Sequence, residues 1–167
     1  MKSMKKGVWQ IGDGVGGWAM GIAGLVAVAS IIGWAMLKPN TASEIQGITT
    51  IMQEMRQLRN STGYGTSDYV PALAGSLGKS VTVTSGKLYN KSGGDITVVG
   101  AGVGFTVTTT KLSQSDCIKL ATTLSGADVT TTKINNGSSF TGEVPTVSAQ
   151  TACTAGNTNS LAFTTSS

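Results

Sequence analysis

The chain has 167 residues, of which 40% are apolar and only 12% are charged, and its formal net charge is +4. So small and dispersed a positive charge lacks the clustered basic face of nucleic-acid-binding proteins, and we expect no nucleic-acid partner. Histidine is absent, which removes the commonest general base and the commonest metal ligand, so the composition argues against an enzyme and against a metal or cofactor.

Residues 1–17 form a short basic segment with lysines at positions 2, 5 and 6, followed by a glycine-rich stretch over residues 7–17. Such a stretch is a poor helix and a poor hydrophobic region for a signal peptide. Because it ends in Gly16-Gly17 directly before a long apolar segment, it presents an extended, accessible peptide bond. We therefore expect a peptidase to cut between Gly17 and Trp18.

Residues 18–37 (WAMGIAGLVAVASIIGWAML) are almost wholly apolar, and no charge lies between Asp13 and Lys38. At 1.5 Å per residue a helix of this length spans about 30 Å, the thickness of the hydrocarbon core of a bilayer. The lysines lie before the segment, so the N-terminus is predicted to be cytoplasmic and residues from 38 onward to be exported.

Small residues recur along this predicted helix at spacings of four, at Ala19, Ala23 and Ala27, with two glycines beside them. A ridge of this kind allows neighbouring helices to approach closely. It is also common in ordinary single-span anchors, and the pair Trp18 and Trp34 suits the two membrane interfaces. The segment alone therefore leaves anchorage and helix assembly as alternatives.

The apolar pattern continues beyond the membrane segment as an amphipathic one, with Ile45, Ile48, Met52 and Met55 at spacings of three and four, extended by Leu58. This predicts a helix over residues 40–60 that continues the first, so that one long helix covers residues 18–60. Pro39 removes a backbone donor and should kink the helix at the junction.

Residues 61–167 hold 36 of the 42 serine and threonine residues, a composition that favours β structure. A loop over residues 60–75 precedes short alternating runs that predict strands at residues 81–84, 86–89, 96–99 and 105–109. One short helix is predicted over residues 113–125, because Ser113 and Asp116 have capping-box spacing. The tail from residue 128 is expected to form further strands and loops.

The two cysteines, Cys117 and Cys153, are too few for a zinc site, so a disulfide in an oxidising compartment is the default, with two unrelated buried thiols as the alternative. The glycines of the GAGVG run at residues 100–104 superficially resemble a nucleotide-binding turn. Since the following residues predict a strand and not a helix, we interpret them as a glycine-rich strand edge or bulge.

A basic leader ending in Gly16-Gly17, an aromatic first residue Trp18, an apolar helix joined through Pro39 to an amphipathic extension, and a threonine-rich domain with a cysteine pair together resemble the type IVb prepilins. The resemblance is greatest to the major pilins of the thin pili of conjugative plasmids. It implies cleavage after Gly17 by a membrane-embedded prepilin peptidase. It also implies assembly into a helical homopolymer by an inner-membrane platform protein and an assembly ATPase, with a tip adhesin as a further partner.

One position departs from the pattern of that family, in which most members place a glutamate fifth after the cut, where this chain has Ile22. The resemblance therefore implies that subunits register by helix packing and not by a salt bridge to the neighbouring terminal amine. The residues expected at this packing contact are Ala19, Ile22, Ala23, Ala27 and Trp34. The resemblance also implies that Cys117 and Cys153 close the C-terminal region.

The sequence thus predicts an α+β protein whose long N-terminal hydrophobic helix, kinked near Pro39, packs on a small antiparallel β-sheet domain. The predicted function is that of a non-enzymatic pilus subunit, held in the inner membrane as a precursor and then in an extracellular filament. Surface adhesion and donor–recipient contact follow from the resemblance. The alternative is a membrane-anchored or secreted β-rich binding domain, in which Ala27-Val28-Ala29 serves as a signal-peptidase site.

Overall fold

The computed structural model describes residues 39–77, 81–126, 128–137 and 139–166. The chain divides into two units, Met1–Lys38 and Pro39–Ser167, and the description below concerns the second. The leader, the apolar segment and the expected packing residues from Ala19 to Trp34 lie outside the described residues. In the part of the chain that is described, no helix has both the length and the apolar character needed to cross a membrane.

Helix α2 (Pro39–Gln57) is the amphipathic helix that the spacing predicts. Its buried face includes Ile48, Met52 and Met55 as expected, and also Ile51. Leu58 was expected on this face but lies beyond the end of the helix with 40% of its surface exposed. The helix ends three residues before the predicted boundary because the Leu58 amide turns back to the Met55 carbonyl and residues 60–63 form a tight turn.

Within the described residues, seven antiparallel strands form a single sheet in the order β1-β2-β3-β4-β7-β5-β6. Their bounds are β1 (Thr82–Thr84), β2 (Lys87–Tyr89), β3 (Asp95–Ala101), β4 (Gly104–Leu112), β5 (Thr131–Ile134), β6 (Ser139–Thr141) and β7 (Asn159–Thr164). The four strands predicted between residues 81 and 109 are present, and β3 and β4 are longer than the patterns indicated.

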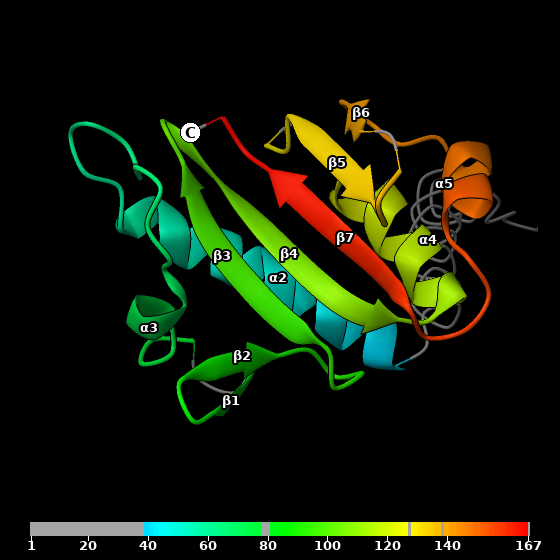
Figure 1. Cartoon of the computed structure of the whole chain (residues 1–167), viewed down its shortest axis with the longest axis horizontal. Helices are drawn as coiled ribbons and strands as arrows, with labels where there is room; N and C mark the ends of the chain where they lie inside the picture. Colours follow the sequence, from blue (N-terminus) through cyan, green and yellow to red (C-terminus); the bar gives the residue numbers. More distant parts are fainter. Residues whose placement is uncertain (1–38, 78–80, 127, 138, 167) are drawn as a thin grey trace, which may run out of the picture. The chain divides into compact units, whose positions relative to one another are not determined.

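Alternation along the central strands separates an apolar face from a polar one. Val98, Val107 and Phe163 are fully buried on the face that α2 covers, whereas their neighbours in the sequence point away from it. Figure 1 shows α2 behind the strands β3 and β4. The hydrophobic core therefore lies between α2 and the sheet, as the α+β prediction required.

The segment between α2 and β1 is not a plain loop. The Tyr64 amide donates to the Gly102 carbonyl at 2.7 Å and the Gly100 amide donates to the Ser67 carbonyl at 2.9 Å, so the segment runs along the free edge of β3. A Cβ on Gly100 would clash with the Tyr64 carbonyl oxygen and one on Gly104 with the Thr165 carbonyl, so close backbone contact explains these two glycines. Gly102 instead has a positive φ of 69°.

Two short helices were not predicted. Helix α3 (Val70–Leu73) lies in the expected loop, where Asp68 accepts a hydrogen bond from the Val70 amide and Pro71 suits the first turn. Helix α5 (Thr146–Ala152) lies in the expected strand-and-loop tail. Both are too short, and α5 too rich in threonine and serine, for periodicity to reveal them.

Helix α4 (Gln114–Leu124) matches the helix predicted over residues 113–125. The Ser113 hydroxyl accepts a hydrogen bond from the Asp116 amide at 3.1 Å, as the capping-box spacing indicated. The buried side of α4 carries Cys117, Leu120 and Ala121 against the same core.

Candidate functional site

The outward face of α2 is an uncharged strip of small, polar and partly exposed side chains. Ala42, Gln46, Thr49 and Gln53 follow one another at spacings of three and four, and Ile45 lies beside them partly buried. Residues at these spacings share one side of a helix. The strip offers no nucleophile with a base and no metal ligands, and it carries no charge that would oppose contact with another helix.

The first turn of α2 is held by buried polar contacts to α4. The Thr41 hydroxyl donates to one carboxylate oxygen of Asp116, and the Ser113 hydroxyl donates to the other at 2.6 Å. Thr41 and Asp116 are both buried. A buried carboxylate is stable only when its oxygens are hydrogen-bonded, so this trio fixes the position of the N-terminal end of α2 on the domain.

A second buried carboxylate, Glu44, fixes the same end of α2 to the turn between β2 and β3. Its Oε1 atom accepts hydrogen bonds from the Ser92 amide at 3.1 Å and from the Ser92 hydroxyl at 3.2 Å. Burial raises the pKa of the Glu44 carboxyl above its ordinary value of 4.5, while the bonds from Ser92 act in the opposite direction and Asp116 adds a small repulsion.

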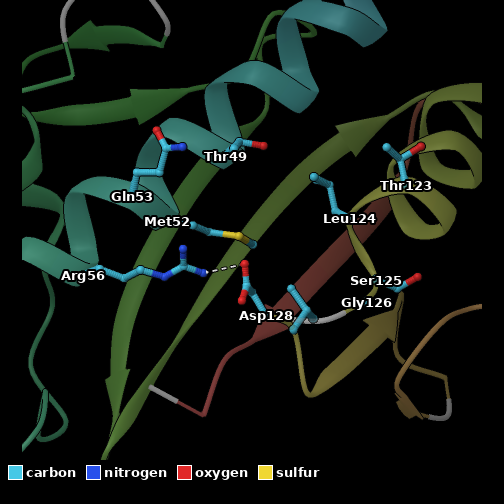
Figure 2. Close-up of a pocket in the computed structure, with 10 residues that line it drawn as sticks. Thr49, Met52, Gln53, Arg56, Thr123, Leu124, Ser125, Gly126 and Asp128 are labelled. Atoms are coloured by element: carbon cyan, nitrogen blue, oxygen red, sulfur yellow. Dashed lines mark ion pairs between the residues drawn. The ribbon is translucent and has the colours of Figure 1, made fainter.

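Near its C-terminal end, α2 borders a groove of about 260 Å³. An ion pair joins the two sides of the groove, with Arg56 Nη2 at 3.1 Å from Asp128 Oδ2, as Figure 2 shows. The two side chains are 38% and 69% exposed. Water therefore screens the pair. The groove is lined by Thr49, Met52, Gln53 and Arg56 from α2 and by Thr123, Leu124, Ser125, Gly126, Asp128 and Val129 opposite.

The predicted disulfide joins Cys117 on α4 to Cys153, directly after α5, with a Cα–Cα distance of 6.0 Å. Side-chain amides secure the backbone on both sides of it. Gln114 donates to the Cys153 carbonyl and Asn135 to the Ala152 carbonyl, each at 2.9 Å. The buried Asn159 accepts from the Thr154 amide and donates to the Thr154 carbonyl, which closes the loop that follows.

The predicted functional residues divide into two groups. Cys117 and Cys153 lie together as expected, and Pro39 is the first residue of α2 as described, although the expected kink also involves residues before it that lie outside the described part of the chain. The cleavage pair Gly17 and Trp18 lies outside it too. Within the described residues, no three acidic or cysteine side chains gather as a metal-binding group.

The polar anchors of α2 were not predicted, although the sequence carries one signal for them. Glu44 precedes Ile48 by four residues, so it occupies a position on the buried stripe of an amphipathic helix. A carboxylate at such a position requires a partner in the folded protein. That the partner is Ser92, 48 residues further on, depends on the tertiary fold.

Comparison with known proteins gives matches to one kind of protein. The sequence profile of the family described as PilS N terminal matches residues 38–166. A solved structure of a type IVb pilin from Salmonella typhi is similar, with 30% sequence identity and a TM-score of 0.59, covering 74% of this chain and 95% of that chain.

A second solved structure, TcpA, a type IV pilin from Vibrio cholerae El Tor biotype, has 15% identity and a TM-score of 0.47, covering 76% of this chain and 99% of that chain. The comparison with curated proteins gives no match.

Proposed function

The chain belongs to the type IVb pilin family and is therefore a structural subunit of a surface pilus and not an enzyme, and from this premise we propose that it is the major subunit, made as a precursor and cut after Gly17. Pilins polymerise into filaments. In this proposal a prepilin peptidase releases the leader in the inner membrane, and a platform protein and an assembly ATPase then add subunits to a helical homopolymer through residues 18–37.

The uncharged strip on α2 is the observation that carries this proposal. In the sequence it follows, after Lys38 and Pro39, the uncharged segment of residues 14–37. An uncharged, apolar segment such as residues 18–37 suits lipid before assembly and contact with neighbouring helices afterwards. On α2 the carboxylate of Glu44 is buried, and Arg56 near the C-terminal end lies outside the strip.

Registration of the subunits must then depend on close packing, because Ile22 stands where most members of the family have a carboxylate. We assign this contact to Ala19, Ala23 and Ala27, with Ile22 and Trp34 beside them. Adhesion, a tip adhesin and donor–recipient contact during conjugation belong to the same proposal and rest on the resemblance to the thin-pilus pilins.

Intact-mass measurement of the surface protein tests the cleavage. The proposal requires a chain that starts at Trp18, and a bulky residue in place of Gly17 should leave the precursor in the membrane. A chain that starts at Ser30 would support the secreted binding domain instead, and an uncut chain would contradict both.

The packing contact is tested by Ala23→Leu, which keeps the segment apolar while adding bulk where a neighbouring helix should approach. Cleavage and the membrane pool should be normal, with few or no filaments sheared into the medium. Ala29→Leu adds the same bulk on another side of the helix and serves as the matched control. Equal filament yields from both variants would show that Ala23 is not at a tight contact.

A further inference from the structure

The face of the sheet that points away from α2 carries an array of threonines in register. Thr106 pairs with Thr164, Thr164 with Thr131, and Thr131 with Thr141, which places four threonines side by side on β4, β7, β5 and β6. A second row begins with the pair Thr97 and Thr108 on β3 and β4. We call these six residues the threonine face: Thr97, Thr106, Thr108, Thr131, Thr141 and Thr164.

No member of the threonine face is buried, whereas the alternate residues of the same strands are buried against the core. In Figure 1, α2 lies on the far side of β3 and β4. The face is thus accessible on the domain, and the helices α2 and α4 cover the opposite face.

Most of its hydroxyl groups have no protein partner. The Thr106 and Thr164 hydroxyls bond each other at 2.9 Å. Those of Thr97, Thr108, Thr131 and Thr141 have no hydrogen bond within the described part of the chain. Each is therefore free to donate one hydrogen bond and to accept others.

The array is also rigid and regular. Threonine is β-branched and restricted at χ1, so ordering its hydroxyl on a ligand costs little conformational entropy. Neighbouring strands hold their side chains about 4.8 Å apart. The threonine face is therefore a fixed grid of hydroxyl groups and methyl groups.

The side chains of the threonine face suit some classes of binding partner better than others. Protein interfaces are built around apolar and aromatic anchors. The two rows contain no aromatic residue, and their one large apolar side chain, Val99, lies at the end of a row. An acidic polymer would need several cations, and the rows supply only Lys133, opposite Ala162. A neutral ligand rich in hydroxyl groups matches the grid best.

We propose that the threonine face binds a neutral polysaccharide lying across the strands. The inference rests on the proposed function, because a filament repeats the threonine face in every subunit. Many weak contacts then act together, and the filament attaches strongly to the polysaccharide. The single-subunit contact is weak, since it is polar and exposed to water.

The test uses purified filaments passed over beads of dextran, amylose or galactomannan, with hyaluronate beads as an acidic comparison. The double variant Thr108→Val and Thr131→Val keeps shape and strand preference while removing two free hydroxyls. We expect the parent to be retained on at least one neutral polysaccharide and retention to fall about tenfold in the variant, the effect of roughly 1.4 kcal/mol. Thr84→Val on the exposed edge strand β1 is the matched control and should bind as the parent does.

Electron microscopy scores filament formation separately. If no filaments form, the full chain in detergent, biotinylated and clustered on streptavidin beads, is assayed with the same polysaccharides, so a failure of assembly does not affect the result. The proposal is overturned if the parent is not retained on any of the three neutral polysaccharides or if the double variant binds equally well. Retention on hyaluronate alone that Lys133→Gln abolishes would also overturn it, in favour of simple charge attraction.

Discussion

The two ends of α2 are attached to the same domain by different kinds of polar interaction. At the N-terminal end, the buried Thr41 bonds the buried Asp116 on α4, and the buried Glu44 carboxylate bonds Ser92, an exposed residue of the β2–β3 turn. At the C-terminal end the polar side-chain contact is the exposed ion pair of Arg56 and Asp128. Buried, fully bonded carboxylates hold geometry tightly, whereas exposed ion pairs contribute little.

The difference between the two ends of α2 agrees with the proposed function as a filament subunit. The N-terminal end of α2 is the end that continues in the chain toward residues 18–37, so forces on that segment reach the domain at Thr41 and Glu44 first. A rigid attachment there holds α2 in a fixed position on the domain. The opposite end carries no such load, and a weak contact suffices.

The largest effect is expected from opening the disulfide, since it holds α4, the partner of the N-terminal end. Cys117→Ser should lower the free energy of unfolding by about 2 to 5 kcal/mol, because the closed segment no longer restricts the unfolded chain. Urea unfolding of the full chain in detergent, with and without reductant, measures this. A reductant should reproduce the effect in the parent, and an unchanged midpoint in both would show that the bridge is not structural.

Removing the carboxylate that joins α4 to α2 should have the next largest effect. Asp116→Ala leaves the Thr41 and Ser113 hydroxyls without their acceptor and should cost about 3 kcal/mol. The same urea unfolding assay applies. Thr41→Val removes only the contact to α2 and should cost less. No loss in Thr41→Val would mean that Asp116 acts through the cap of α4 alone.

The pH dependence of stability tests Glu44. Because burial raises the pKa of Glu44 in the folded state, the folded chain binds this proton more readily than the unfolded chain. The stabilisation of the folded state by this proton is complete below the ordinary pKa of 4.5 and is lost as the pH rises through the raised pKa. Glu44→Gln should therefore gain stability relative to the parent between about pH 4 and pH 7.

Glu54→Gln on the same helix is the matched control for this measurement, because Glu54 lies outside the buried contact. Unfolding free energies of the parent and both variants are compared at several pH values. If the two variants follow the same trend with pH, burial of Glu44 is not the cause.

The smallest effect is expected at the C-terminal end of α2. Arg56→Ala should change the free energy of unfolding by about 0.5 kcal/mol or less, because the pair with Asp128 is exposed and screened by salt. A double-mutant cycle with Asp128→Asn measures the pair directly. A coupling above about 1 kcal/mol would contradict the contrast between the two ends.

Local patterns predicted the elements whose residues repeat regularly. The stripe of Ile48, Met52 and Met55 predicted α2, and the capping spacing of Ser113 and Asp116 predicted α4. The cysteine pair was predicted because two thiols allow one pairing. Helices α3 and α5 were missed because four and seven residues are too few for a helical period.

What the sequence could not predict is which distant residues meet. Glu44 and Ser92 are 48 positions apart, and Thr41 and Asp116 are 75 apart. The threonine face could not be predicted from the sequence either, because Thr106, Thr164 and Thr131 become neighbours only through the strand order β4-β7-β5. Composition predicted abundant threonine in strands, but not the single surface on which it gathers.

That strand order also bears on the timing of export. Strand β7 follows β5 and β6 in the sequence yet lies between β4 and β5, so the β5–β6 hairpin has no other strand to join until Asn159–Thr164 has emerged. A chain that crosses a membrane from its N-terminal side therefore cannot complete the sheet midway through translocation. Because β7 is the last strand in the chain, the sheet stays incomplete until nearly all of the domain has crossed the membrane.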